Sequence, residues 1–416
     1  MKKQRFLGII SLSFLLFSCA PKNPLPTIDI LKPEAGETVA VLDAGAERYL
    51  ALTSSQEEAS YLSTYSGLAF YDTQRVSFSW KAKSSGHYRL TFSEKEDLSS
   101  SWSYEVDGNT FDEYTAFVPG QRYFWKVELG KDNSDPFVPV ASSLVSSFET
   151  TKDTLRPIGL EGAWNVRDIG GWLNEEGERT SYQRIYRGSR LNGVENASAL
   201  TDNGQKTLQT LGIQTEIDLR TPNQDDSGQD RSVIEGAKYV KAPMMPACMI
   251  FPFYEDKEHS HQYDPRTATS LQQIFEALGD PSSYPIYIHC NAGADRTGTL
   301  LYLIEGLLGW KEEDLIRDFE LTSFSRSGKR WRSSIDSETG DFSPEGVMQD
   351  DGSLYVAFGK MNSLMKEHYG NANGSIKEAI ERYLTTEFNI SSNQIETLRK
   401  MMLEKNSSVA PEKKSL

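Results

Sequence analysis

Tyr284-Pro-Ile-Tyr-Ile-His-Cys290-Asn-Ala-Gly-Ala-Asp-Arg296-Thr-Gly298 is the stretch that decides the fold of this chain. Its first residues, up to His289, are mostly β-branched and aromatic, which is typical of a short buried strand. Apolar residues at helical spacing follow from Thr297 to Leu308, which predicts a helix. Between the strand and the helix, successive backbone N–H groups can form a concave nest beside the helix N-terminus, and such a nest binds anions.

Cys290 and Arg296 both lie in this expected nest. The oriented N–H groups, the helix N-terminus and the guanidinium all favour a thiolate over a thiol. A thiolate can attack the phosphorus of a phosphate ester and form a phosphocysteine intermediate. Arg296 offers a planar pair of donors to two phosphate oxygens, and the hydroxyl of Thr297 can hydrogen-bond the sulfur as it leaves. The alternative is a buried structural cysteine beside a glycine turn, with Arg296 in a surface ion pair.

The remaining loop positions are expected to surround the phosphate with backbone groups. Gly293 lacks the Cβ that would block a close approach of the backbone to the phosphate. His289, directly before the cysteine, is expected to order the loop through hydrogen bonds. The loop differs from a nucleotide-binding P-loop, because the lysine is missing and a cysteine lies at the centre. The predicted phosphate-binding positions of the loop are Asn291, Ala292, Gly293, Ala294 and Gly298.

The string resembles the signature loop of the cysteine-dependent protein tyrosine phosphatase superfamily. More narrowly, it is similar to bacterial tyrosine/serine phosphatases whose loop is Cys-x-Ala-Gly-Lys-Asp-Arg-Thr-Gly. The resemblance covers roughly residues 155–405 and implies a cofactor-free, metal-free α/β phosphatase acting on phosphotyrosine, or on phosphoserine and phosphothreonine, in proteins. Other segments similar to this branch follow in order: Asn165–Gly171, Ile185–Leu191, Leu200–Asp202, Leu211–Arg220 and Gly374–Arg399.

Two loop positions refine what the resemblance implies. Ala294 replaces a lysine that the family links with recognising further phosphates, which weakens an assignment to phosphoinositides or inositol phosphates. These remain the alternative substrate class. Asp295 is present, and the resemblance implies that it is the general acid that protonates the leaving oxygen. Rival acids lie between Asp256 and Asp264, in a polar segment that is either a flap or a solvated loop; the nearby His259 and His261 are expected at the surface.

Two other motifs have open interpretations. Arg167 and Asp168 precede Gly170-Gly171, so they belong to a turn or, by the family resemblance, lie near the phosphate. Asp218 and Arg220 follow at the end of a predicted strand, where α/β folds gather active-site groups. A structural ion pair between these two residues is the alternative.

The N-terminus predicts export. Residues 1–18 combine a basic start with a short apolar core, Phe6–Phe17, which is typical of a signal peptide and too short for a bilayer span. Leu16-Phe-Ser-Cys19 resembles the lipobox of bacterial lipoproteins, so cleavage would leave Cys19 as the lipidated first residue. We therefore expect a membrane-anchored protein of the bacterial cell envelope. An ordinary secretory signal is the alternative.

Cysteine content and charge limit the partners. Besides Cys19, only Cys248 and Cys290 are present, which is too few for a disulfide framework. A disulfide between these two is one hypothesis, and a small buried hydrophobe at Cys248 is the other. The formal net charge of −15 disfavours nucleic acid and anionic membrane surfaces as partners. An anionic substrate must therefore be attracted by the local pocket.

A chain of 416 residues is expected to hold two domains. We predict a tether over 19–33, an all-β sandwich over 34–152, an α/β phosphatase domain over 153–405 and a disordered tail over 406–416. The stretch from Pro119 to Val127 resembles the corner and sixth strand of fibronectin type III domains. The β domain is either a spacer or a recognition module for glycans or proteins. Its predicted strands include Arg75–Trp80, His87–Phe92, Tyr123–Leu129 and Leu144–Glu149.

The α/β domain is predicted to contain further elements around the loop. Thr201 caps a helix that ends near Leu211, and Thr215–Leu219 is a strand. The polar stretch Ser323–Asp350 is expected to be a long loop near the pocket. Outside the enzymes, the chain could be a lipoprotein that captures phosphorylated ligands with little turnover. The helices predicted after the catalytic one are Glu312–Leu321, Ser353–Glu367, Ile376–Thr385 and a last one ending near Met402.

Overall fold

The fold is described here from a computed structural model, which divides the chain into two compact units. One comprises Met1–Val41 and Gln74–Lys152, and the other comprises Leu42–Thr73 and Asp153–Leu416. The predictions for residues 1–24, Cys248, Asp256–Asp264 and 406–416 fall outside the described residues and remain predictions. The residues that the structure describes are 25–64, 76–81, 86–113, 117–131, 136–193, 200–222, 228–244, 265–325, 334–335, 342–343, 358–371 and 374–404.

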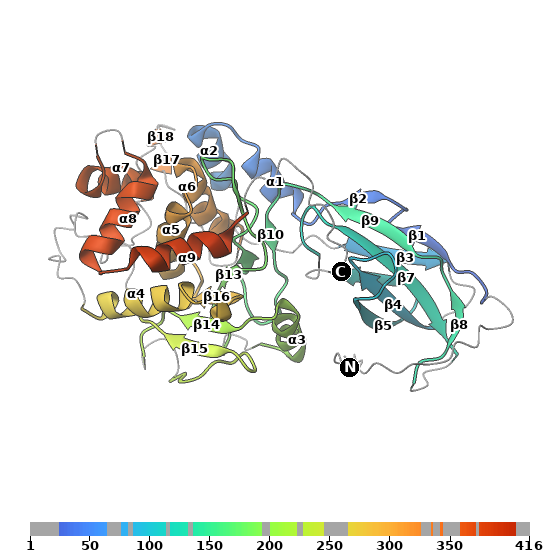
Figure 1. The fold of residues 1–416 in the computed structure, drawn as a ribbon. Coiled ribbons are helices and arrows are strands. Elements are labelled where there is room, and N and C mark those ends of the chain that lie inside the picture. The colour runs from blue at the N-terminus through green and yellow to red at the C-terminus, as the bar shows by residue number, and fades with distance from the viewer. Residues whose placement is uncertain are drawn as a thin grey trace. The chain divides into compact units, whose positions relative to one another are not determined.

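The described residues of the first unit form two β-sheets (Figure 1). The smaller sheet is antiparallel, with the order β1-β3-β6, and the larger has the order β2-β9-β7-β4-β5, with β8 paired to β7. All four predicted strands coincide with strands of this unit, whereas β1, β2, β5, β6 and β8 match none of the predicted strands. The strands are β1 (Asp29–Lys32), β2 (Glu37–Val39), β3 (Val76–Lys81), β4 (His87–Ser93), β5 (Ser101–Asp107), β6 (Thr110–Glu113), β7 (Arg122–Gly130), β8 (Pro139–Ser142) and β9 (Ser146–Thr150).

Alternation of side chains explains the core of this unit. In β3, Val76, Phe78 and Trp80 are buried while the residues between them are less so, as expected where one sheet face is covered. The ring of Phe78 lies edge-on to that of Trp125 of β7, with 4.8 Å between the ring centroids. Aromatic side chains therefore supply much of the apolar surface that holds the two sheets together.

Residues 42–64 correct the predicted boundaries of the β domain. This segment was expected within the 34–152 sandwich, but it forms helices α1 (Ala44–Leu50) and α2 (Ser55–Thr64) of the second unit. The side chain of Asp43 accepts a hydrogen bond from the Gly45 N–H and caps α1. Leu42, Ala46 and Tyr49 recur at helical spacing, and all three join the main apolar cluster of the second unit.

The second unit contains a mixed six-stranded sheet with the order β10-β11-β13-β16-β14-β15. Strands β13, β16, β14 and β15 are parallel, and β10 and β11 are antiparallel to their neighbours. The strands are β10 (Arg156–Pro157), β11 (Arg167–Asp168), β13 (Ile185–Gly188), β14 (Thr215–Asp218), β15 (Lys238–Lys241) and β16 (Ile286–His289), with two short pairs, β12 (Arg179–Thr180) with β19 (Leu403–Glu404) and β17 (Ser334–Ile335) with β18 (Phe342–Ser343).

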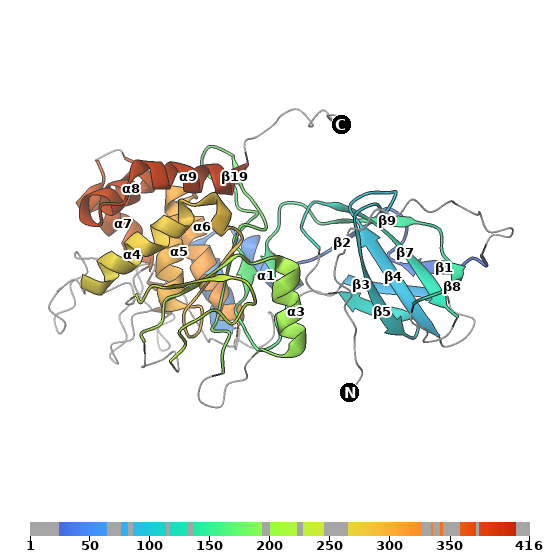
Figure 2. The same ribbon diagram turned by 60° about the horizontal axis from the view of Figure 1, so that its bottom comes forward.

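Helices cover both faces of this sheet. Tyr186 and Tyr287 belong to the apolar cluster that includes Leu208 and Leu211 of α3 (Asp202–Leu211), while Ile185 and Ile286 belong to the larger cluster on the other face. Adjacent residues of one strand point to opposite faces, which explains this division. Figure 2 shows α3 apart from the group of helices that contains α4, α5, α8 and α9. The helices that follow α3 in the chain are α4 (Pro265–Leu278), α5 (Asp295–Leu307), α6 (Glu312–Glu320), α7 (Phe358–Tyr369), α8 (Ile376–Glu387) and α9 (Ser392–Met402), with short 3-10 helices η2 (Pro281–Ser283) and η3 (Leu321–Phe324).

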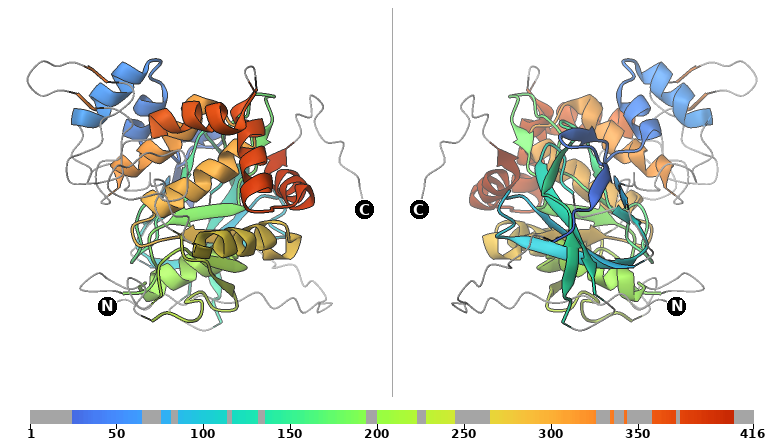
Figure 3. Two further views of the ribbon diagram at one scale, coloured as in Figure 1. Left: turned by 90° about the vertical axis from the view of Figure 1, so that its left-hand side faces the viewer. Right: turned by 90° about the vertical axis from the view of Figure 1, so that its right-hand side faces the viewer.

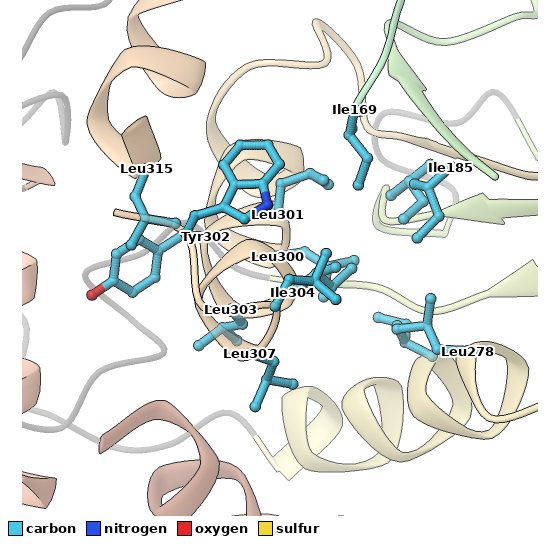
Figure 4. Packing of buried hydrophobic residues seen from close by; sticks show 14 of the residues in the cluster. Ile169, Ile185, Leu278, Leu300, Leu301, Tyr302, Leu303, Ile304, Leu307 and Leu315 are labelled. Atoms are coloured by element: carbon cyan, nitrogen blue, oxygen red, sulfur yellow. The ribbon is translucent and has the colours of Figure 1, made fainter. Parts of the chain in front are cut away.

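Helix α5 is the central helix of this unit. All its residues from Thr297 to Leu307 are buried, and its apolar side chains contact the sheet and the surrounding helices (Figure 4). A helix that is buried on all sides is held rigidly, so it fixes the loop at its N-terminus. The predicted strand before this loop, the helix after it, the helix capped by Thr201 and the four later helices are all present. Helix α4 was not predicted.

Within the described ranges, no helix combines the length and the apolar character needed to cross a membrane.

Candidate active site

The signature loop, Cys290–Arg296, connects β16 to α5. It follows the carboxyl end of β16, beside the parallel strands β13 and β14. Cys290 is a free thiol with 3% of its surface exposed, so it does not form the disulfide that was one hypothesis for it. Asp295 and Arg296 are the first two residues of α5 and are partly exposed. Cys290 therefore follows the end of β16 and Arg296 lies in the first turn of α5, within one strand–loop–helix connection. The N-terminus of a helix favours a bound anion.

Gly293 is required by packing inside the protein. Its φ of +67° is in the left-handed region, and an added Cβ would lie 2.3 Å from the carbonyl carbon and oxygen of Gly188 in β13. The sequence analysis attributed this glycine to close approach of the phosphate. The structure corrects that reason, because the space that a side chain would fill is already occupied by the backbone of β13.

The carbonyl group of Gly293 is held by two buried side chains. Asn165 Nδ2 and Arg187 Nη2 each donate a hydrogen bond of 2.9 Å to its oxygen. In a trans peptide the carbonyl and the following N–H point in opposite directions. The N–H of Ala294 therefore points away from these donors, and the carbonyl dipole, which would repel an anion, is turned towards Arg187 and Asn165.

A buried ionic cluster lies behind the loop and consists of Arg167, Arg187, Asp318 and Glu305. Arg167 Nε donates to Asp318 Oδ1 over 3.0 Å, and Arg187 pairs with the other oxygen of the same carboxylate. Each of the four side chains is at most 2% exposed. Removing so many charged groups from water is costly unless each one is paired or neutral.

The pKa shifts favour a net positive charge on this cluster. Burial raises the pKa of Glu305 well above its ordinary value and Asp318 raises it further, which favours the neutral form of Glu305. Burial alone would raise the pKa of Asp318, but Arg167 and Arg187 outweigh it and hold that pKa below its ordinary value. Two guanidiniums thus face one carboxylate. The excess positive charge, in a medium of low dielectric constant, favours an anion bound in the adjacent loop.

Arg167 and Asp168 have structural roles and are corrected as phosphate contacts. Arg167 is committed to Asp318 and to Asn165 Oδ1, which it reaches over 2.7 Å. Asp168 pairs with Arg156 and accepts hydrogen bonds from the backbone N–H groups of Gly170 and Gln183. Burial raises the pKa of Asp168, although Arg156 opposes this. The turn interpretation of this motif is the one that the structure supports.

His289 orders the start of the loop, as predicted. Its Nδ1 lies 3.1 Å from the carbonyl oxygen of Cys290, and its Nε2 lies 2.9 Å from Glu216 Oε1. Glu216 also accepts hydrogen bonds from Ser232 and from the Val233 N–H. Burial alone would raise the pKa of Glu216, but His289 and the hydrogen bonds from Ser232 and Gln229 together outweigh burial and hold the pKa below its ordinary value. The sequence analysis missed Glu216, whose signal is a carboxylate within an otherwise buried strand.

Asp218 and Arg220 form the structural ion pair that was the second interpretation of this motif. Their side chains are 2.9 Å apart and fully buried. Lys241 pairs with the same carboxylate, and Tyr239 donates a hydrogen bond to it over 2.8 Å. Burial alone would raise the pKa of Asp218, but His289 and the cations Arg220 and Lys241 hold it well below its ordinary value.

Arg190 is a further cation beside the loop, and the sequence analysis gave it no role. Its Nη1 donates to the side-chain oxygen of Asn291, and its backbone N–H donates to the Asn291 carbonyl over 3.1 Å. The guanidinium carbon lies 4.9 Å from the centre of the Trp164 ring, a cation–π distance. The signal was present, because Arg190 belongs to the second family-like motif.

The remaining predicted loop residues differ in their exposure and contacts. Asn291 and Ala292 are partly exposed, whereas Ala294 is fully buried. The backbone N–H of Gly298 donates a hydrogen bond of 2.7 Å to the Ala294 carbonyl, and an added Cβ would lie 2.9 Å from the ring of Phe319 in α6, so the described contacts of Gly298 are internal. The hydroxyl of Thr297 is fully buried and makes no hydrogen bond within the described part of the chain, so its expected bond to the Cys290 sulfur is absent.

Comparison with known proteins identifies the second unit. The profile of the tyrosine phosphatase family matches residues 158–404. The chain belongs to this family. A provisionally named tyrosine-protein phosphatase of Cupriavidus necator is 25% identical over 203 residues, which are 44% of this chain and 66% of that protein. A tyrosine-protein phosphatase of Nostoc commune is 24% identical over 191 residues, 43% of this chain and 65% of that protein.

The matched segments span just under two thirds of the length of these two tyrosine phosphatases. Among solved structures, the core catalytic domain of the PP-IP phosphatase SIW14 from S. cerevisiae is 20% identical. The match covers 35% of this chain and 76% of the yeast domain, with a TM-score of 0.23. Within this member of the tyrosine phosphatase family, the matched region contains the whole signature loop and the buried ionic cluster. Helices α1 and α2 lie outside it.

Proposed function

We propose that this chain hydrolyses phosphate monoesters, chiefly phosphotyrosine in proteins, through a phosphocysteine intermediate at Cys290. The observation that carries the proposal is the signature loop itself. Cys290 lies at the end of β16, Arg296 lies in the first turn of α5, and the Gly293 carbonyl is tied to Asn165 and Arg187. Family membership supports the same chemistry.

The reaction has two steps. The Cys290 thiolate attacks phosphorus, the S–P bond forms, the P–O bond to the substrate breaks, and Asp295 donates a proton to the leaving oxygen. Water then attacks phosphorus and loses its proton to Asp295, while the S–P bond breaks and the thiolate is regenerated. Arg296 holds two phosphate oxygens in both steps. The positive cluster behind the loop stabilises the charge of the transferred group.

Ala294 supports a substrate with a single phosphate. Its methyl group is fully buried, so this position offers no cation to a second phosphate group. Inositol phosphates and phosphoinositides, the alternative substrates, carry several such groups. A phosphotyrosine side chain carries one, and its ring can reach a deep thiol such as Cys290, which is 3% exposed.

A phosphate-release assay with matched substrates tests this proposal. The protein is assayed under reducing, metal-free conditions with phosphotyrosine and phosphoserine peptides, a phosphoinositide and an inositol phosphate. We expect the highest kcat/KM for the phosphotyrosine peptide. A higher kcat/KM for the inositol phosphate would refute the proposed substrate class. Tight binding of all four compounds without phosphate release would instead favour a phospho-ligand-binding lipoprotein.

We further propose that the chain is anchored in the cell envelope through a lipid on Cys19, with the first unit as a fibronectin type III-like spacer or recognition module. Its sheets, β1-β3-β6 and β9-β7-β4-β5, support that comparison. So does the bond from the Val118 N–H to the Tyr123 hydroxyl, because such a tyrosine corner occurs in these sandwiches. Metabolic labelling with a radioactive fatty acid tests the anchor: we expect label in the wild type and none in Cys19→Ala.

A further inference from the structure

The helical insert, α1 and α2, belongs to the phosphatase unit although the chain reaches it from a strand of the β unit. It lies between β2 and β3 in the sequence and outside the region that matches the family. Figures 1 and 3 show it beside α6. Its contacts with α6 and η3 are buried and specific, which raises the question of what they fix.

One contact joins Tyr49 to Glu320. The Tyr49 hydroxyl donates a hydrogen bond of 2.6 Å to Glu320 Oε2, and both side chains are fully buried. The Tyr49 ring also lies edge-on to Phe324 of η3, with ring centroids 5.3 Å apart. A short hydrogen bond to a buried carboxylate is strong, because no water competes for it.

A second contact lies one turn earlier on α6. Arg317 Nε donates to Glu58 Oε1 over 2.7 Å, and its Nη2 donates to the Leu52 carbonyl over 3.0 Å. Glu58 of α2 is fully buried. The insert therefore holds the last turn of α6 from both of its helices.

The same turn of α6, with η3, supports the signature loop. Asp318 pairs with Arg187, which donates to the Gly293 carbonyl. Thr322 accepts a hydrogen bond of 3.3 Å from Asn165 Nδ2, the group that also donates to Gly293. Residues 317 and 320 thus contact the insert, while residues 318 and 322 contact the groups that hold the loop.

We propose that the helical insert positions the signature loop: Tyr49 and Glu58 fix α6 and η3, and these fix the Gly293 carbonyl through Asp318 and Thr322. The inference rests on the proposed function, since the loop is the phosphatase site. A small displacement of α6 would move the loop amides relative to the transferred phosphate, and misplacements of this kind reduce kcat strongly. Tyr49 and Glu58 are positioning residues that do not touch substrate.

Two tyrosine variants of the full chain test this proposal. Tyr49→Phe removes the hydrogen bond to α6. Tyr61→Phe removes a bond of 3.1 Å to the Gly45 carbonyl, which lies within the insert, and is the matched control. We expect Tyr49→Phe to lower kcat about 10- to 100-fold with a smaller change in KM, because the loop amides act chiefly on the transition state. Tyr61→Phe should keep the wild-type kcat.

A second readout does not depend on turnover. The rate at which iodoacetate alkylates Cys290 at one fixed pH, followed by peptide mass mapping, reports how the loop presents this thiol. We expect this rate to fall in Tyr49→Phe and to keep its wild-type value in Tyr61→Phe. A wild type without turnover would refute the proposed function, while this alkylation rate would still test the positioning.

Two results would overturn the proposal. One is a wild-type kcat together with a wild-type alkylation rate of Cys290 in Tyr49→Phe. The other is an equal change in both tyrosine variants. If Tyr49→Phe is recovered unfolded, Glu58→Gln, which weakens the pair with Arg317, replaces it under the same criteria. A double variant adds a further test: Tyr49→Phe with Glu320→Gln should be no slower than the slower single variant if the effect passes through that bond.

Discussion

Arg187 Nη2 lies 2.9 Å from the carbonyl oxygen of Gly293, and the same guanidinium pairs with Asp318. A single buried arginine therefore connects the catalytic loop to α6. Together with the bond from Asn165, it holds the Gly293 carbonyl in place before any substrate is bound. This relationship also shows that the loop depends on residues distant from it in the sequence.

Replacing Arg187 with lysine should lower kcat more than the same replacement of Arg156. Arg187→Lys keeps a positive charge but cannot bond Asp318 and Gly293 together, since lysine lacks the planar fork. We expect kcat to fall about 10- to 100-fold. Arg156→Lys is the control, because Arg156 is also buried and pairs with Asp168, which lies outside the signature loop. Equal losses of kcat in both variants would contradict this account of Arg187.

Breaking the shared carboxylate should destabilise the protein. Asp318→Asn leaves Arg167 and Arg187 buried without their common counter-ion, and losing one partner of a buried ion pair costs about 3–5 kcal/mol. Denaturant unfolding of the second unit should show a loss of this size. A loss below about 1 kcal/mol, the range of surface pairs, would mean that the cluster is not as buried as described.

The neutral form of Glu305 predicts an unusual pH dependence. Its pKa is raised in the folded state, so its contribution to stability is complete below its ordinary pKa and is lost as the pH rises above it. Glu305→Gln mimics the protonated form. The stability of this variant relative to the wild type should therefore increase from pH 4 to pH 7, at up to about 1.4 kcal/mol per pH unit.

The stability contributed by Glu216 should change with pH in the opposite direction to that of Glu305. Its pKa is lowered, so its carboxylate stabilises the fold above its ordinary pKa and that contribution is lost as the pH falls. Glu216→Gln should therefore cost more stability at pH 7 than at pH 4. Denaturant unfolding of Glu305→Gln and Glu216→Gln at pH 4 and pH 7 checks both predictions. If the stability relative to the wild type changed in the same direction with pH in both variants, the opposite pKa shifts of Glu305 and Glu216 would be refuted.

Two glycine-to-alanine variants distinguish the cost of backbone strain from the cost of a steric clash. Gly212→Ala at the end of α3 has a φ of +66° and no atom within 4 Å of the added Cβ, so only strain of about 1–2 kcal/mol is expected. Gly293→Ala has nearly the same φ, but its Cβ would overlap the backbone of Gly188. We expect a larger loss of stability and a loss of turnover. Similar stabilities for the two variants would contradict the close packing against β13.

The sequence predicted the strand, loop and helix of the site because their signals are local. Periodicity and turn residues within about 25 positions define them, and Cys290, Asp295 and Arg296 lie in one continuous stretch. Helix α4 had a comparable signal, since Leu271, Ile274, Phe275 and Leu278 recur at helical spacing.

The supports of the site could not be predicted in this way. Arg187 and Asp318 are 131 positions apart, so only the folded sheet and helices bring them together. The sequence indicates the helical insert only weakly, because α1 has only 7 residues. Its buried face packs against α6 and η3, which lie far along the chain. Gly293 was predicted correctly as a special position but for the wrong reason, since its nearest neighbour is a strand that sequence alone did not place there.

Direct trapping of the phosphocysteine tests the central claim. Residues 20–416 are mixed with a phosphotyrosine peptide under reducing, metal-free conditions, quenched in acid within the first turnover and mapped by mass spectrometry, with Cys290→Ser in parallel. The account predicts a phosphate on the peptide that contains Cys290 and phosphate release that Cys290→Ser abolishes. Phosphate release that persists in Cys290→Ser would contradict it.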